Sequence, residues 1–99
     1  MSMGQRFLQR RLTQASHRIR ELREELRIVH DQLSHLTDEA DDLSLRAMVS
    51  ETPAASFEYR EAKKHADAMT THRDGLVAEI ASLEKKINDY LDRMKDARL

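Results

Sequence analysis

Five histidines are the side chains of this sequence best suited to metal or acid–base chemistry. His65 and His72 are seven residues apart, which on a helix places them two turns apart. Two ligands of one metal ion come from helix positions i and i+3 or i+4, so this spacing is too long. Glu61 and His65 have the shorter spacing, but a single pair does not make a site. The sequence therefore predicts no metal site and no cofactor.

The sequence has few residues suited to nucleophilic catalysis. The chain has no cysteine. The neighbouring pairs Ser16–His17 and Ser34–His35 point to different faces of a helix. The two glycines, Gly4 and Gly75, form no phosphate-binding loop. Since a pair of long helices also offers no concave pocket, we predict that the chain is not an enzyme.

A run of arginines in the first 27 residues is the one candidate footprint for nucleic acid: Arg6, Arg10, Arg11, Arg18, Arg20, Arg23 and Arg27. Acidic residues follow closely, and there is neither an aromatic platform nor a recognition motif. The net charge of the chain is −1. We therefore expect no nucleic-acid partner.

Two long amphipathic helices must carry these side chains. Apolar residues recur in alternating steps of four and three, which keeps one seam facing a partner helix. The first seam consists of Leu8, Leu12, Ala15, Ile19, Leu22, Leu26, Val29, Leu33, Leu36, Ala40, Leu43 and Ala47. The second consists of Tyr59, Ala62, Ala66, Met69, Arg73, Leu76, Ile80, Leu83, Ile87, Tyr90, Met94 and Ala97. Arg73 is the one charged member, and we expect its stem to lie along the core and its guanidinium to reach solvent.

The only strong break is the stretch from Ser50 to Pro53. Proline fits the first turn of a helix, and Thr52 is a suitable N-cap for it. The sequence predicts a frayed end over residues 1–4, a helix over about 5–49, a turn over about 50–55 and a helix over about 56–97. The expected fold is all-α, an antiparallel two-helix coiled-coil hairpin forming a single domain over 5–99.

Two registers of the hairpin satisfy the seams. One sets Leu22 opposite Ile87 and places Arg23 near Glu84. The other sets Leu22 opposite Ile80. Flanking charges favour the first by a few tenths of a kcal/mol per pair, and the Thr52 cap favours the second. The balance leans slightly to the first.

Apolar residues outside the seam indicate further contacts. Ile28 and Phe7 lie at heptad position c, and Val77 and Leu91 at position e. They are either scattered surface residues or a second contact face. The second interpretation predicts a homodimer, with two hairpins in a four-helix arrangement.

Charge is divided unevenly along the chain. Residues 1–27 hold seven basic and three acidic side chains, and residues 28–62 hold two basic and eight acidic ones. The acidic group Asp38, Glu39, Asp41 and Asp42 lies towards the turn and is a candidate partner-binding element. Antiparallel pairing of two hairpins would set basic ends over acidic tips.

No segment is apolar for long enough to span a bilayer, and the N-terminus does not have the pattern of a signal peptide. We therefore expect a cytoplasmic protein that does not enter a membrane.

The stretch from Asp41 to Pro53, followed by Glu58-Tyr59-Arg60-Glu61-Ala62, resembles small uncharacterised coiled-coil proteins of actinobacteria. That resemblance implies a helical hairpin and carries no activity. The hairpin is also similar in length to the secreted WXG100 proteins, but it lacks their Trp-x-Gly turn. It is similar in shape and tip charge to the transcript-cleavage factors that insert an acidic coiled-coil tip into RNA polymerase.

The function expected from the sequence is therefore a non-enzymatic protein–protein interaction module that acts as an adaptor, assembly factor or regulator. The contacts would use the helix faces or the acidic tip. The alternatives are a structural homo-oligomer without a separate client and a factor that inserts its tip into RNA polymerase.

Overall fold

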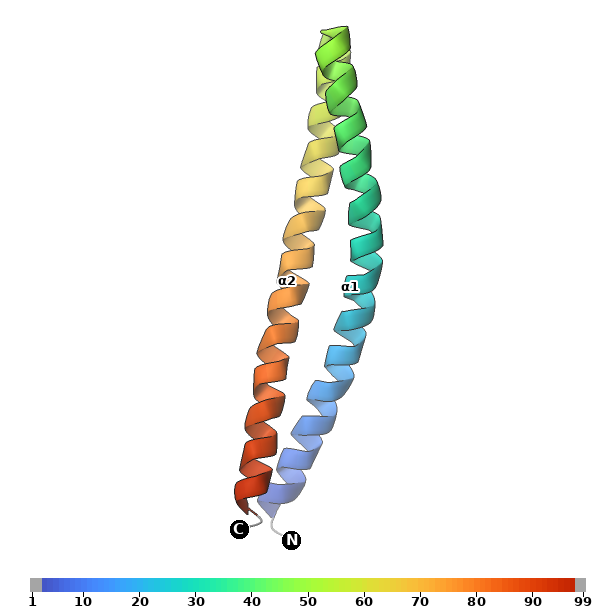
Figure 1. Ribbon diagram of the computed structural model, residues 1–99. Coiled ribbons are helices and arrows are strands. Elements are labelled where there is room, and N and C mark those ends of the chain that lie inside the picture. Colours follow the sequence, from blue (N-terminus) through green and yellow to red (C-terminus); the bar gives the residue numbers. More distant parts are fainter. Residues whose placement is uncertain (1–2, 98–99) are drawn as a thin grey trace. The chain divides into compact units, whose positions relative to one another are not determined.

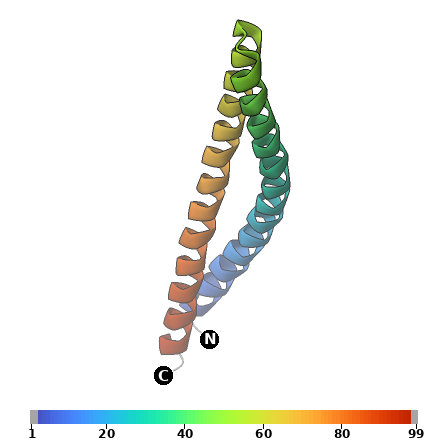
Figure 2. The same ribbon diagram turned by 45° about the horizontal axis from the view of Figure 1, so that its top comes forward.

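The computed structural model describes residues 3–97, which form two α-helices joined by a turn of two residues. Helix α1 runs Met3–Ser50 and helix α2 runs Pro53–Ala97. The residues between 3 and 97 include no strand. In both views the end of α1 and the start of α2 lie side by side and run in opposite directions (Figures 1 and 2). The predicted all-α helical hairpin is confirmed.

The heptad pattern separates buried from exposed residues along both helices. Every seam residue whose side chain is described is buried or half-buried. Leu22 is the most enclosed, with 0% of its surface exposed. Ala97, the last predicted seam residue, lies outside the described side chains. The seam also extends one position further back than predicted, because Gln5 is buried at the a position that precedes Leu8.

The hairpin divides into two compact units. The open-end unit comprises residues 3–25 of α1 and 76–97 of α2, and the turn unit comprises residues 26–75. On α2 the division falls at Gly75, two residues after the charged seam residue Arg73. Gly75 weakens a helix by about 1 kcal/mol relative to alanine, and a charged seam residue limits apolar packing. Both features were visible in the sequence.

The core of the open-end unit is built from large aliphatic side chains. Its buried apolar residues are Leu8, Ala15, Ile19, Leu22, Leu76, Ile80 and Met94. The core of the turn unit is sparser, with Val29, Leu33, Ala40 and Ala66 buried. Since apolar burial contributes roughly 25 cal/mol per Å², the open-end unit carries more of the hydrophobic stabilisation.

The turn reverses the chain in the two residues Glu51 and Thr52. Glu51 has a φ of 52°, and its N–H donates to the carbonyl of Ala47 at 3.1 Å. This is the left-handed C-cap that ends many helices. The Oγ1 of Thr52 accepts from the N–H of Ala55 at 3.2 Å, so the predicted N-cap is confirmed. Because the two caps adjoin, the turn is shorter than the stretch 50–55 assigned to it.

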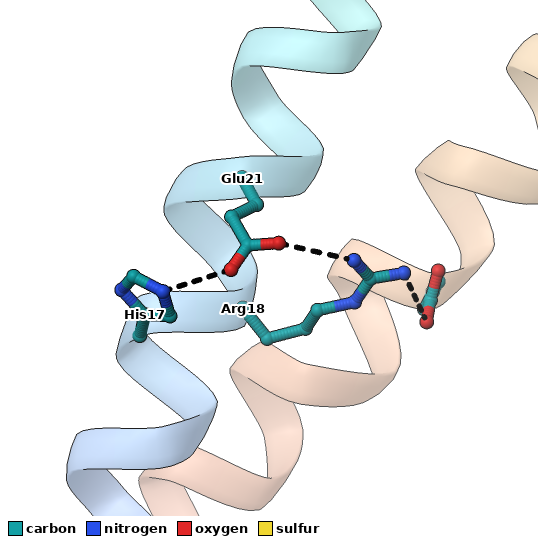
Figure 3. Close-up of polar contacts among 4 residues, drawn as sticks. His17, Arg18 and Glu21 are labelled. Carbon is teal, nitrogen blue, oxygen red and sulfur yellow. Dashed lines mark hydrogen bonds and ion pairs between the residues drawn. The ribbon is translucent and has the colours of Figure 1, made fainter.

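Two ion pairs between the helices show which register the open-end unit has. Arg18 Nη2 lies 3.5 Å from Glu79 Oε1, and Arg23 Nη2 lies 3.2 Å from Glu84 Oε1. In Figure 3, Arg18 also bonds Glu21 on its own helix, at 3.4 Å, and reaches across to α2. From the first ion pair to the second, the residue number rises by five on both helices. Along one flank of an antiparallel pair, the number rises on one helix and falls on the other. The two ion pairs therefore lie on opposite flanks of the seam.

The level of the seam follows from the midpoints of these pairs. Because the two ion pairs lie on opposite flanks, the seam between them is at their mean level. The point midway between Arg18 and Arg23 on α1 therefore lies level with the point midway between Glu79 and Glu84 on α2. In this register Leu22 is level with Ile80. The register that pairs Leu22 with Ile87 was favoured from flanking charge, and that preference was wrong. The Arg23–Glu84 ion pair expected for that register does form, but it forms in the register that sets Leu22 level with Ile80. Exposed ion pairs contribute too little to set the register against the geometry of the turn.

Arg73 behaves as the seam pattern predicted. Its side chain is 34% exposed, and its Nε and Nη2 donate to Asp74 Oδ1 at 3.1 and 2.9 Å. The stem therefore lies in the seam while the guanidinium reaches the surface. At the other end of the chain, Met3 and Gly4 belong to α1 although a frayed end was predicted there, and the first two residues lie outside the described part.

Candidate protein-interaction surface

The four predicted acidic residues do not share one face. Asp38, Asp41 and Asp42 lie at heptad positions f, b and c, which form the outer face of α1, opposite the seam. Glu39 lies at position g, on a flank of the seam. All four are exposed. The outer three, here called the acidic triad, form no ion pair with any residue that the structure describes.

Three large apolar side chains follow the acidic triad on the same face. Leu45, Met48 and Val49 occupy positions f, b and c one heptad later, about 10 Å further along the helix. Their exposed fractions are 61%, 67% and 86%. We call these residues the turn patch, because they occupy the last two turns of α1 before Glu51. The outer face of α1 thus presents an acidic triad followed by an apolar one.

Glu39 belongs to a separate groove on a flank of the turn unit. Leu36, Leu43 and Ala62 are half-buried residues of this groove, and Phe57 extends its apolar surface. The charged and polar lining consists of Glu39, Glu58, Glu61 and His65. Phe57 is 57% exposed, so the groove is a second acidic and apolar surface of the same unit.

The three apolar residues predicted to form a second contact face are each about half exposed. Val77 and Leu91 lie two heptads apart on α2 in the open-end unit, both at position e. Ile28 lies on the outer face of α1 in the turn unit. Each unit thus holds part of the predicted set.

A basic counterpart lies on the outer face of α1 in the open-end unit. Arg6, Phe7 and Arg10 occupy positions b, c and f, and we call them the arginine cluster. Phe7 is 47% exposed, and the guanidinium carbon of Arg11 lies 5.1 Å from its ring centroid. Neither Arg6 nor Arg10 pairs with a carboxylate among residues 3–97.

The described residues offer little for other kinds of chemistry. No three His, Asp or Glu side chains within them converge on a point where a metal ion could be held. Within the same range, neither helix contains an apolar stretch long enough to cross a bilayer. Another recess of the turn unit is lined by Ala47, Met48, Glu51, Thr52, Pro53, Ser56 and Arg60.

The chain was compared with protein families, curated proteins and solved structures. No family model, curated protein sequence or solved structure matches it.

The turn patch and Phe57 were missed from the sequence, although the signal was present. The apolar residues predicted outside the seam were Phe7, Ile28, Val77 and Leu91. Equal heptad positions in successive repeats pair Asp38, Asp41 and Asp42 with the turn patch and identify the outer face directly.

Proposed function

We propose that this chain is a non-enzymatic protein–protein interaction module that contacts its partner through the acidic triad and the turn patch on the outer face of α1. The observation that carries the proposal is the exposure of Leu45, Met48 and Val49, between 61% and 86%. Full burial of such a side chain is worth about 1.5–3 kcal/mol. Covering the three would therefore release several kcal/mol in favour of a bound state.

The acidic triad adds direction to this apolar surface. Three carboxylates within five residues repel one another, and a cation brought near them lowers that repulsion. Charge around an apolar centre guides approach and excludes wrong partners more than it adds affinity. A partner would therefore offer an apolar side chain to the turn patch and basic side chains one to two helical turns away.

A site-specific crosslink tests whether this surface is in use. A photo-activated phenylalanine analogue is placed at Met48, in cells that carry the gene. The matched control carries the analogue at Lys64, which is also exposed, on the outer face of α2 in the same unit. We expect a discrete crosslinked species from position 48, absent from position 64. It should disappear when Asp41→Asn and Asp42→Asn are added.

The outcome against the proposal is equally defined. If position 48 gives no more crosslinked product than position 64 does, the outer face of α1 is ordinary solvated helix surface and the assignment fails.

A further inference from the structure

We infer that the occupant of the turn patch is a second copy of this chain, whose arginine cluster seats on the turn patch and the acidic triad. The inference rests on the proposed function, because it names the partner of that same surface. It is argued from the apolar, charge and spacing match between two surfaces that each copy carries.

The apolar parts of the two surfaces are complementary in size. Phe7 is a single large side chain with about half its surface exposed, between Arg6 and Arg10 on the outer face of α1. The turn patch supplies three exposed aliphatic side chains, Leu45, Met48 and Val49. Packing an aromatic ring against aliphatic side chains removes apolar surface of both from water, which favours association.

The charges around these apolar centres are of opposite sign. Arg6 and Arg10 flank Phe7 and have no carboxylate partner among the described residues. The acidic triad precedes the turn patch and likewise has no cationic partner there. The same opposition holds for the units. The turn unit carries ten acidic and six basic side chains, and the described part of the open-end unit carries eight acidic and ten basic ones.

The spacing of the residues allows both matches together when the two α1 helices are antiparallel. Packing Phe7 of one copy on Leu45 of the other brings Arg10 level with Asp42, because three residues forward on one helix correspond to three residues back on the other. The same alignment brings Arg11 level with Asp41 and Arg6 level with Arg46, which lies at the flank position g, so the charge match is made by Arg10 and Arg11. Asp41 lies beside Asp42 at the next outer position. Arginine is suited to this role, since its long planar side chain can bond two carboxylates.

Charge reversal with compensation in the purified full-length chain tests the contact. One variant carries Asp41→Arg and Asp42→Arg, a second carries Arg6→Glu and Arg10→Glu, and a third carries all four changes. Sedimentation velocity between 10 and 200 µM protein in 50 mM salt measures association, and circular dichroism verifies helicity. We expect the wild type to associate, each two-residue variant to associate at least tenfold more weakly, and the four-residue variant to recover.

A matched control separates this face from the groove of the same unit. Glu58→Arg with Glu61→Arg reverses the same number of carboxylates in the same unit, but on the groove. We expect its association to stay within about threefold of the wild type.

Three results would overturn the inference: a wild type that stays monomeric over the whole range, two-residue variants that associate like the wild type, or a four-residue variant that does not recover. A monomeric wild type together with a crosslink from position 48 to a different protein would leave the proposed function standing. Absence of the crosslink would remove both.

Discussion

Glu51 is the residue on which the reversal of the chain depends. Its φ of 52° lies in the left-handed region, which costs a residue with a Cβ about 1–2 kcal/mol. Glycine adopts this region without that penalty, and no described residue of the turn is a glycine. The structure therefore stores a small strain at the turn, and that strain can be relieved at one position.

We expect Glu51→Gly to raise the free energy of unfolding by about 0.5–1 kcal/mol. The relief of left-handed strain is partly offset by the greater freedom of glycine in the unfolded chain. Urea unfolding followed by circular dichroism measures the change. Glu51→Ala is the control, because it removes the carboxylate and keeps the Cβ, and it should show no such gain. A destabilised Glu51→Gly would contradict the assigned φ.

Gly75 gives a second prediction at a single residue. It lies inside α2 with a negative φ, and a Cβ built on it meets nothing within 4 Å. Gly75→Ala should therefore stabilise the fold by about 1 kcal/mol. For a chain of this size that corresponds to a rise in Tm of about 4–8 °C. A fall in Tm on thermal unfolding would show that the backbone here is not ordinary helix.

At the scale of the helices, the periodic pattern predicted most of the fold. The steps of four and three located both helices and every described seam residue except Gln5, because burial along a long helix depends mainly on spacing. Thr52 and Pro53 located the reversal, because capping is local chemistry. The division into two units and the left-handed Glu51 were not predicted, since they depend on how one helix packs against the other.

The register shows why flanking charge was a poor guide. The long side chains of Arg23 and Glu84 can pair across an exposed flank in either register, so their attraction does not distinguish the two registers. The two-residue turn does separate them, because it leaves no slack between the ends of the helices. The turn patch differs from the register in this respect, because its residues repeat the heptad positions of the acidic triad and could be located from spacing alone.

Paired cysteines test the register directly, since the chain has no cysteine of its own. Leu22→Cys with Ile80→Cys should form an intramolecular disulfide under mild oxidation, because the two positions are level across the seam. Leu22→Cys with Ile87→Cys is the control and should remain reduced, because a disulfide requires Cα atoms within about 7 Å. Thiol titration and gel mobility at low protein concentration distinguish the two results. A disulfide in the control alone would restore the rejected register.

At the scale of the whole molecule, nearly balanced total charge conceals an uneven distribution. The chain carries 17 basic and 18 acidic side chains, and the acidic excess lies in the turn unit. When two copies approach, units with the same excess charge repel each other, and the acidic turn unit of one copy attracts the basic open-end unit of the other. Self-association should therefore respond to ionic strength more than the fold does.

We expect association of the wild type to weaken at least fivefold between 50 and 500 mM sodium chloride. Over this interval the screening length falls from more than 10 Å to about 4 Å. The far-ultraviolet circular dichroism should stay constant, because the helices are held by apolar seams. Repeating the measurement on the variant with Arg6→Glu and Arg10→Glu gives the control, whose residual association should show little salt dependence. Association of the wild type that strengthens with salt would indicate a purely apolar interface.

The two-residue turn constrains how the gene for such a hairpin can change in length. With no slack between the caps, an insertion in α1 alone would rotate its later apolar residues off the seam by about 100° per residue added. Adding seven codons to each helix, at positions level with each other, keeps the two apolar seams facing one another. It also keeps the C-cap of α1 next to the N-cap of α2. Length variants that keep this fold are therefore expected to differ by paired blocks of seven codons, and the Glu51–Thr52 junction stays at their centre.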